Sequence, residues 1–232
     1  GAEVLGVQSV PDIDELPAGE IDLVFVCTPK DANPDLLRKC AAKGVKAAFL
    51  TSAGYGEAGE QGRRDEADLV ALCEELGILL AGPNGQGVVS TPAQLCAQIV
   101  APYPPAGPIG VASQSGNFIS SFLNLSLATG VGISRAVSAG NAAATGVADF
   151  LGFYESDPAT KVGLAYVEGL EDGRGFFDAV RQITPTMPVV VVKGGAKDFV
   201  SRYLQVWRRE PQGWRMASWQ STLVPAATLG TQ

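Results

Sequence analysis

Strand-length apolar runs alternate with amphipathic, helix-length segments along the first hundred residues. The apolar residues of 36–41 recur at helical spacing, and either Asp31 or Asn33 can cap this helix. The expected elements are strands at 21–27, 45–50 and 78–81, one helix closed by Gly44, and a longer helix over 63–76. This β-α-β-α-β order predicts a parallel sheet with helices on both faces and ligands at the carboxyl ends of its strands.

A Pro-rich segment at 102–108 interrupts this pattern and predicts a domain boundary. The alternation then restarts. Strands are expected at 109–112, 134–137, 162–167 and 189–193, and helices at 118–128, 146–155 and 173–183. This second stretch predicts a nearly complete doubly wound α/β domain.

The pattern changes again after residue 197. Two roughly alternating segments, 203–209 and 214–222, are joined by the turn residues of 210–213, and they contain all three Trp residues of the chain. These features predict a β-hairpin. A two-stranded hairpin is marginal alone, so this one needs its own chain's surface or a partner to cover it.

Composition excludes several classes of protein. Of the 232 residues, 46% are hydrophobic and 18% charged, which is typical of a globular chain. Basic residues number 17 and acidic residues 24, and a net charge of −7 argues against nucleic-acid binding. The longest apolar runs are strand-sized, so we expect no membrane association. Four Cys without metal-binding or CxxC spacing favour buried residues of a cytoplasmic protein.

The sequence contains no His. This excludes Ser-His catalysis, His-based metal sites and a phosphohistidine within the residues given, and no metal is expected. Candidate chemistry therefore lies in the loops after the strands, where backbone N–H groups at helix N-termini suit phosphate or carboxylate groups. The best of them is 113–117, Ser-Gln-Ser-Gly-Asn, although a well-capped helix is the favoured explanation of that loop when it is taken alone. Glu168 at a strand end can likewise be an ordinary solvated carboxylate.

In order, however, these segments resemble the NDP-forming acyl-CoA synthetases, which include acetate–CoA ligases and feruloyl-CoA synthetase-like proteins and are related to the succinyl-CoA synthetase α subunit. The resemblance covers about residues 1–196. The segments that carry it are Cys27-Thr28-Pro29, Thr51 to Glu57, Gly82-Pro83-Asn84-Gly85-Gln86-Gly87, Ser113 to Asn117, Ser138-Ala139-Gly140-Asn141, Asp149-Phe150-Leu151, Asp157-Pro158-Ala159-Thr160, Tyr166-Val167-Glu168-Gly169 and Lys193-Gly194-Gly195.

The resemblance implies a Rossmann-like CoA-binding domain followed by a flavodoxin-like domain, in an acid–thiol ligase that works through phosphohistidine. A separate ATP-grasp subunit or domain would handle ATP or ADP, and the assembly would be a homo- or hetero-oligomer that binds CoA or acyl-CoA. Glu168 would hold the phosphohistidine ring. The residues that would contact CoA or the phosphoryl group are Thr28, Pro29, Ser52, Ala53, Gly54, Glu57, Asn84, Ser113, Ser115, Gly116 and Asn117.

The expected domains are 1–101, which lacks the family's first strand and Gly-rich loop, then 107–196, and a hairpin tail at 198–232. The tail resembles the closing strands of a SnoaL-like or ketosteroid-isomerase-like domain. Because the catalytic His does not follow Lys193-Gly194-Gly195, we expect no synthetase activity from this chain alone. The alternative is a degenerate, non-catalytic CoA- or anion-binding scaffold that associates through its Trp-rich hairpin.

Overall fold

The computed structural model describes residues 3–4, 6–99, 101–194, 200–210 and 213–224, the last two stretches as backbone only. Residue contacts divide the chain into two units. The first comprises Gly1–Gly85 together with Asn141–Thr145, and the second comprises Gln86–Gly140 together with Gly146–Gln232. Each unit has a sheet of its own, and each is described by itself.

The first unit is built on a three-stranded parallel sheet with the order β3-β4-β5. Its elements are β3 (Leu23–Val26), α1 (Asn33–Ala42), β4 (Ala47–Leu50), α2 (Glu60–Leu76) and β5 (Leu79–Ala81), preceded by the short antiparallel pair β1 (Glu3–Val4) and β2 (Val7–Gln8). Three single-turn 3-10 helices occupy Ile13–Glu15, Lys30–Ala32 and Gly56–Ala58. The core includes the fully buried Leu37, Leu50 and Leu80.

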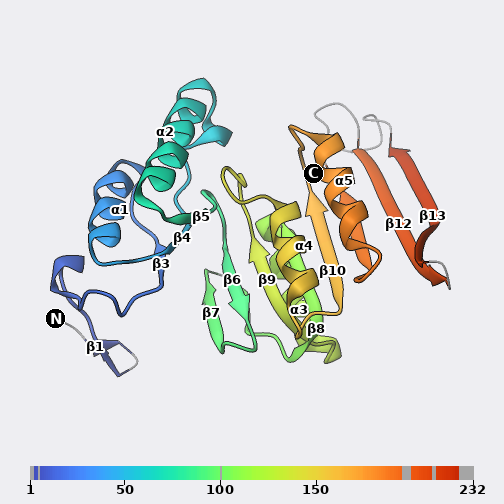
Figure 1. Ribbon diagram of the computed structural model, residues 1–232, viewed down its shortest axis with the longest axis horizontal. Helices are drawn as coiled ribbons and strands as arrows, with labels where there is room; N and C mark the ends of the chain where they lie inside the picture. Colours follow the sequence, from blue (N-terminus) through green and yellow to red (C-terminus); the bar gives the residue numbers. More distant parts are fainter. Residues whose placement is uncertain (1–2, 5, 100, 195–199, 211–212, 225–232) are drawn as a thin grey trace, which may run out of the picture. The chain divides into compact units, whose positions relative to one another are not determined.

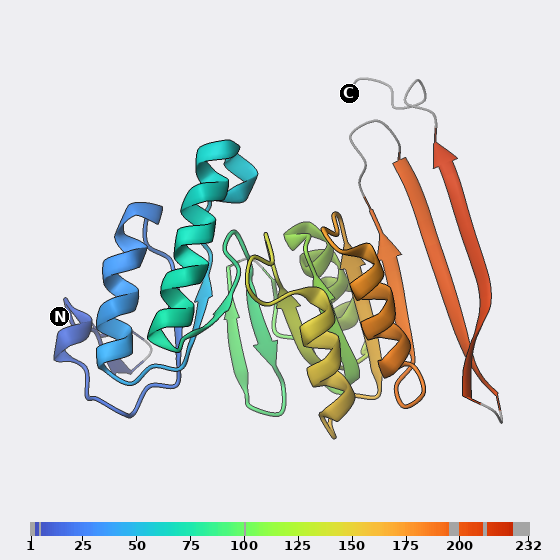
Figure 2. The ribbon, with the colours of Figure 1, turned by 45° about the horizontal axis from the view of Figure 1, so that its top comes forward.

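Both helices of this unit lie on one face of the sheet (Figure 2). The reason is topological: the strands are adjacent in chain order, so two right-handed crossovers progress in the same direction and place α1 and α2 side by side. The expectation of helices on both faces is therefore not met by the described part of this unit. Gly77 ends α2, since its φ of 66° gives the helix a left-handed C-cap.

The second unit contains an eight-stranded sheet of order β13-β12-β11-β10-β8-β9-β6-β7. Its parallel centre consists of β8 (Ala106–Ser113), β9 (Ile133–Ser138), β10 (Val162–Val167) and β11 (Val189–Lys193). The helices are α3 (Gly116–Thr129), α4 (Val147–Ser156) and α5 (Gly173–Ile183). The chain reverses its direction across the sheet at β8, so α3 covers one face while α4 and α5 cover the other (Figure 1). This is the flavodoxin-like, doubly wound arrangement that the sequence predicts.

Two short strands that the periodicity did not reveal, β6 (Gly87–Ser90) and β7 (Leu95–Gln98), belong to this second sheet. β6 pairs antiparallel with β9, and its Val89 is fully buried in the core cluster of α3. The first unit therefore ends at Gly85, whereas we expected the first domain to run to residue 101. The Pro-rich segment that suggested the boundary instead leads from β7 into β8.

The predicted hairpin is confirmed as β12 (Val200–Glu210) and β13 (Gly213–Val224), which pair antiparallel. β12 also pairs antiparallel with β11, matching Val192 with Leu204 and Lys193 with Tyr203. The chain's own sheet thus provides the partner that an isolated hairpin lacks. The side chains of the three Trp residues lie outside the described part of the structure.

Among the described residues, no helix combines the length and apolarity needed to cross a membrane.

Candidate functional site

In the first unit, a buried amide connects the loops that follow β3 and β4. Asn33, fully buried at the start of α1, accepts a hydrogen bond from Thr28 Oγ1 (2.7 Å) and donates from Nδ2 to Ser52 Oγ (3.0 Å) and Tyr55 OH (2.9 Å). Ser52 Oγ in turn donates to the carbonyl of Thr28 (2.7 Å). Asn33 was one of the two residues predicted as the cap of α1. It does not cap this helix, because its side chain is hydrogen-bonded to the neighbouring loop.

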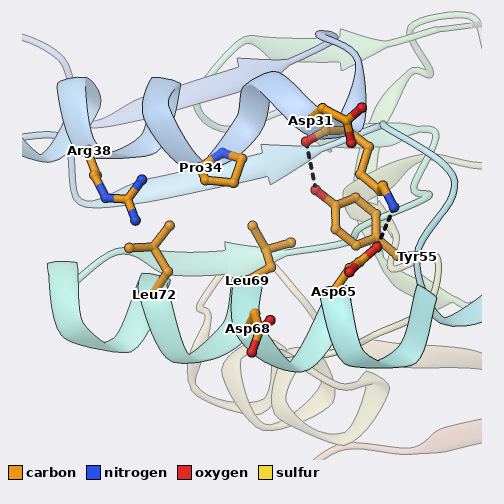
Figure 3. Close-up of a pocket in the computed structure, with 9 residues that line it drawn as sticks. Asp31, Pro34, Arg38, Tyr55, Asp65, Asp68, Leu69 and Leu72 are labelled. Carbon is orange, nitrogen blue, oxygen red and sulfur yellow. Dashed lines mark hydrogen bonds and ion pairs between the residues drawn. The ribbon is translucent and has the colours of Figure 1, made fainter. Parts of the chain in front are cut away.

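A cavity of about 380 Å³ opens between α1 and α2, next to these loops. In Figure 3, Pro34 and Arg38 on α1 face Leu69 and Leu72 on α2 across it. At its other end lies Tyr55, whose pKa is raised by burial. The remaining residues that line the cavity are charged: Lys30, which forms an ion pair with Asp65, and two further carboxylates, Asp31 and Asp68.

Backbone N–H groups of the loop after β4 are hydrogen-bonded to two carboxylates of the same unit. Glu57 accepts hydrogen bonds from the N–H groups of Gly54 and Tyr55, and Glu66 Oε2 accepts from the N–H of Gly56 (3.1 Å). Burial acts to raise the pKa of Glu57, but hydrogen bonds from Asn141 and these N–H groups outweigh it and hold that pKa below its usual range. A phosphate approaching this loop would have to compete with two carboxylates for the same donors.

Asn141 joins those two carboxylates. Its Nδ2 lies 2.6 Å from Glu57 Oε2 and 2.6 Å from Glu66 Oε2, and its Oδ1 accepts from Asn84 Nδ2 (3.2 Å). Asn84 is exposed, has a φ of 59°, and donates its N–H to the carbonyl of Ser52 (3.0 Å). Thr28, Ser52, Glu57 and Asn84 are thus linked through one hydrogen-bonded network in the first unit.

In the second unit, the loop after β8 leads into α3. Ser113 is fully buried, and its hydroxyl closes the loop on itself by donating to the carbonyl of Ser115 (2.9 Å) and accepting from the N–H of Ser115 (3.0 Å). Ser115 is the N-cap of α3 and accepts from the N–H of Phe118 (3.4 Å). The N–H groups of Gly116 and Asn117 have no partner within the described residues, so they remain available to an anion.

Glu168 follows β10, the strand that neighbours β8. Its backbone N–H donates to Gln114 Oε1 (2.6 Å), and its carbonyl accepts from Lys193 Nζ (2.8 Å) at the end of β11. The side chain of Glu168 is exposed and makes no hydrogen bond or ion pair with any residue that the structure describes. The loop is therefore anchored through its backbone, which leaves the carboxylate accessible.

Two Gly residues of the family segments lie close to neighbouring side chains. A Cβ on Gly116 would overlap the side chain of Gln86, whose Oε1 accepts from Ser120 Oγ (2.9 Å) on the first turns of α3. A Cβ on Gly194 would overlap the hydroxyl of Tyr166. The ring of Tyr166 stacks on that of Phe118 with centroids 4.6 Å apart, so the ends of β10, β11 and α3 are packed together.

The predicted site residues thus fall into two groups, one in each unit. Ser113 lies at its expected place, but its side chain shapes the loop and is closed to solvent. Sequence reasoning missed Asn33, Gln114 and the bridging role of Asn141. The order of the loops could have drawn attention to Gln114 and Asn141, which stand within two of the family segments, whereas only the structure shows what their amides bond.

Two family profiles match the chain. One is described as "CoA binding domain" and covers residues 1–124, and the other as "Succinyl-CoA ligase like flavodoxin domain" and covers residues 106–206. Together they define a class of proteins in which a CoA-binding domain is followed by a succinyl-CoA-ligase-like flavodoxin domain. The chain belongs to the family of proteins with these two domains, whose members include NDP-forming acyl-CoA synthetases.

Named relatives agree with this assignment. The chain is 38% identical over 193 residues to acetate–CoA ligase [ADP-forming] I of Archaeoglobus fulgidus, covering 83% of this chain and 28% of that protein. It is 33% identical over 200 residues to the α subunit of acetate–CoA ligase [ADP-forming] II of Pyrococcus furiosus, covering 86% and 43%. A solved structure from Ca. Korarchaeum cryptofilum, the dinucleotide forming acetyl-coenzyme A synthetase 1 in complex with phosphate and ADP, matches with a TM-score of 0.77 and 31% identity, covering 83% and 41%. The chain therefore spans less than half the length of each of these proteins.

Proposed function

We propose that this chain is the CoA-handling core of an NDP-forming acyl-CoA synthetase, an acid–thiol ligase, and that it works with a further segment or partner chain. That partner would contribute an ATP-grasp domain and the histidine that carries the phosphoryl group, since the sequence given contains no His. ATP and ADP would be bound by the partner. The named relatives, which are ADP-forming ligases or their α subunits, support this assignment.

In the first unit, the loops that carry Thr28, Pro29, Ser52 and Asn84 would line the CoA site. Three of these residues already share one network, in which Asn33 fixes the two hydroxyls and Asn84 bonds the carbonyl of Ser52. Ala53, Gly54 and Glu57 extend this rim, although the N–H of Gly54 is already bonded to Glu57. The rim thus offers hydroxyl and amide groups more readily than free backbone donors.

In the second unit, the N–H groups of Gly116 and Asn117, which have no partner among the residues that the structure describes, would bind the phosphoryl group of an incoming phosphohistidine at the positive end of α3. The carboxylate of Glu168 would accept a hydrogen bond from the imidazole and so fix the ring's orientation. The observation that carries the proposal is this combination of free donors and an accessible carboxylate, held by adjacent strands of one family-matched unit.

Calorimetric titration of the chain with CoA tests the first part. We expect micromolar binding, about −8 kcal/mol, and no binding of ATP. Asn84→Ala should weaken CoA binding, whereas Asn124→Ala, which alters an exposed amide on α3, should not. Absence of CoA binding at millimolar concentration would contradict the proposal for the first unit.

A second candidate function is a non-catalytic scaffold with weak affinity for CoA or anions. The backbone N–H groups of residues 54–56 are already hydrogen-bonded to Glu57 and Glu66. This favours the scaffold, because the two carboxylates would repel an incoming phosphate. Such a module would associate through its C-terminal hairpin. It predicts CoA binding weaker than micromolar, together with a mass in sedimentation that rises with protein concentration. The ligase assignment predicts micromolar CoA binding at any protein concentration.

A further inference from the structure

The side chain of Gln114 is bonded to two consecutive residues of another loop. Its Oε1 accepts from the N–H groups of Glu168 (2.6 Å) and Gly169 (3.1 Å), and its Nε2 donates to the carbonyl of Gly169 (3.0 Å). Because both ends of the amide are used, its orientation is fixed. One side chain thus makes three hydrogen bonds across 54 or 55 residues of sequence.

These bonds extend the sheet beyond its last paired residues. β8 and β10 are parallel neighbours with Ser113 opposite Tyr166, and the N–H of Gln114 donates to the carbonyl of Tyr166 (3.0 Å). After this point the two chains enter their loops, and the Gln114 amide replaces the missing backbone partner. The junction lies where the strand order reverses, which is where open α/β sheets bind their ligands.

Glu168 depends on this junction for its position. Its carbonyl is held by Lys193 and its N–H by Gln114, while Gly169 follows with no side chain to restrict its backbone. Without Gln114, two N–H groups and one carbonyl in an exposed loop lose their partners in the protein. Water can satisfy them, so we expect the loop to gain freedom while the sheet beneath it persists.

We propose that Gln114 is a positioning residue that sets the Glu168 carboxylate relative to the free N–H groups of α3. One ligand, an imidazole that carries a phosphoryl group, then meets the carboxylate and the N–H groups at the same time. This inference rests on the proposed function of the second unit. It adds that recognition of the ring, as distinct from recognition of the phosphoryl group, requires Gln114.

The test compares two probes, phosphoimidazole and inorganic phosphate, titrated into the full chain. Wild type should bind phosphoimidazole more tightly than phosphate. Gln114→Ala should weaken phosphoimidazole binding by about tenfold, the loss expected for one or two hydrogen bonds, and leave phosphate binding within about twofold. Gln182→Ala is the matched control and should change neither, because Gln182 is an exposed residue of α5 whose side chain makes no hydrogen bond with the described residues.

A double-mutant cycle separates positioning from a general structural role. In a Glu168→Gln background, Gln114→Ala should cause no further loss of phosphoimidazole affinity, because the carboxylate that it positions is already gone. An equal loss in both backgrounds, or an equal loss for both probes, would refute the inference. Wild type that binds phosphate but does not prefer phosphoimidazole would refute it while leaving the anion site in place. Failure of wild type to bind either probe would overturn the proposed phosphoryl site, and the inference with it.

Discussion

Replacing Asp157 with alanine removes the centre of a buried polar network in the second unit. Asp157 ends α4 with a side chain only 5% exposed, and it accepts from Arg135 Nε (3.0 Å) and Nη2 (3.3 Å) on β9. It also accepts from Thr160 Oγ1 (2.9 Å) and the N–H of Ala159 (3.2 Å). The Asp157-Pro158-Ala159-Thr160 segment therefore has a structural role: it ties the end of a helix to the centre of the sheet.

The size of the loss follows from burial. Removing one partner of a buried pair costs about 3–5 kcal/mol, because the other charge is left without compensation. Arg135 keeps 19% of its side chain exposed and also bonds Ser90, so water and that hydroxyl recover part of the loss. We therefore expect Asp157→Ala to lower the free energy of unfolding by about 3 kcal/mol. Asp178→Ala breaks an exposed pair on α5, with side chains 80% and 44% exposed, and should cost about 0.5 kcal/mol or less.

Urea unfolding followed by Trp fluorescence measures this difference. All three Trp residues lie within Gly146–Gln232 of the second unit, so their emission reports on the unit that contains the pair. Equal slopes of the unfolding free energy against urea would show that the variants share one unfolded state. A cost for Asp157→Ala within about 1 kcal/mol of that for Asp178→Ala would refute the reasoning, because burial would then contribute nothing.

The remaining predictions concern acid, glycine and thiols. Burial acts to raise the pKa of Asp157, but the hydrogen bonds to its carboxylate and the nearby Arg135 hold that pKa below 3.8. The ionised carboxylate therefore stabilises the fold at higher pH, and this stabilisation is lost as the pH falls through the lowered pKa. The melting-temperature gap between wild type and Asp157→Asn should therefore close below about pH 4, and a constant gap would be contrary evidence. Gly152→Ala on the exposed side of α4, where a Cβ meets nothing within 4 Å, should stabilise by up to about 1 kcal/mol. Gly62→Ala on α2 should destabilise in the same urea assay, because its Cβ would overlap a backbone carbonyl. Burial raises the pKa of Cys73 to about 11, so mass spectrometry should show it alkylated by maleimide more slowly at pH 8 than the exposed Cys27.

Much of the fold could be predicted from periodicity because most elements are long and regular. The expected strand at 162–167 and helix at 173–183 agree with β10 and α5 to the residue. β6 and β7 have four residues each, too few for an alternating pattern to stand out. The antiparallel pairing of β6 with β9 joins segments that lie far apart in the sequence, so local periodicity does not reveal it. The first unit therefore ends at Gly85, whereas the expected first domain ran to residue 101, and the Pro-rich segment connects two strands of one sheet.

The candidate site was predictable in outline but not in its contacts. Loops rich in small residues after parallel strands identified 113–117 and Glu168, since sheet topology brings such loops to one edge. Asn33 was one of two candidate caps of its own helix, but its amide bonds a loop that starts 18 residues after it, where it is buried with Tyr55. Amides suit both kinds of partner, so residue type alone could not decide between them.

The excursion of Asn141–Thr145 into the first unit makes each unit discontinuous along the chain. Within that unit, Thr145 Oγ1 donates to the carbonyl of Leu80 (2.7 Å), and the N–H groups of Asn141 and Ala143 bond the carbonyls of Pro83 and Gly82. No single cut of the polypeptide therefore yields two complete units. A fragment that ends at Gly85 would lack these five residues, and a fragment that starts at Gln86 would carry them without their partners. Dissection of this protein for separate study requires a short replacement linker between Gly140 and Gly146, or the two units must be expressed as one chain.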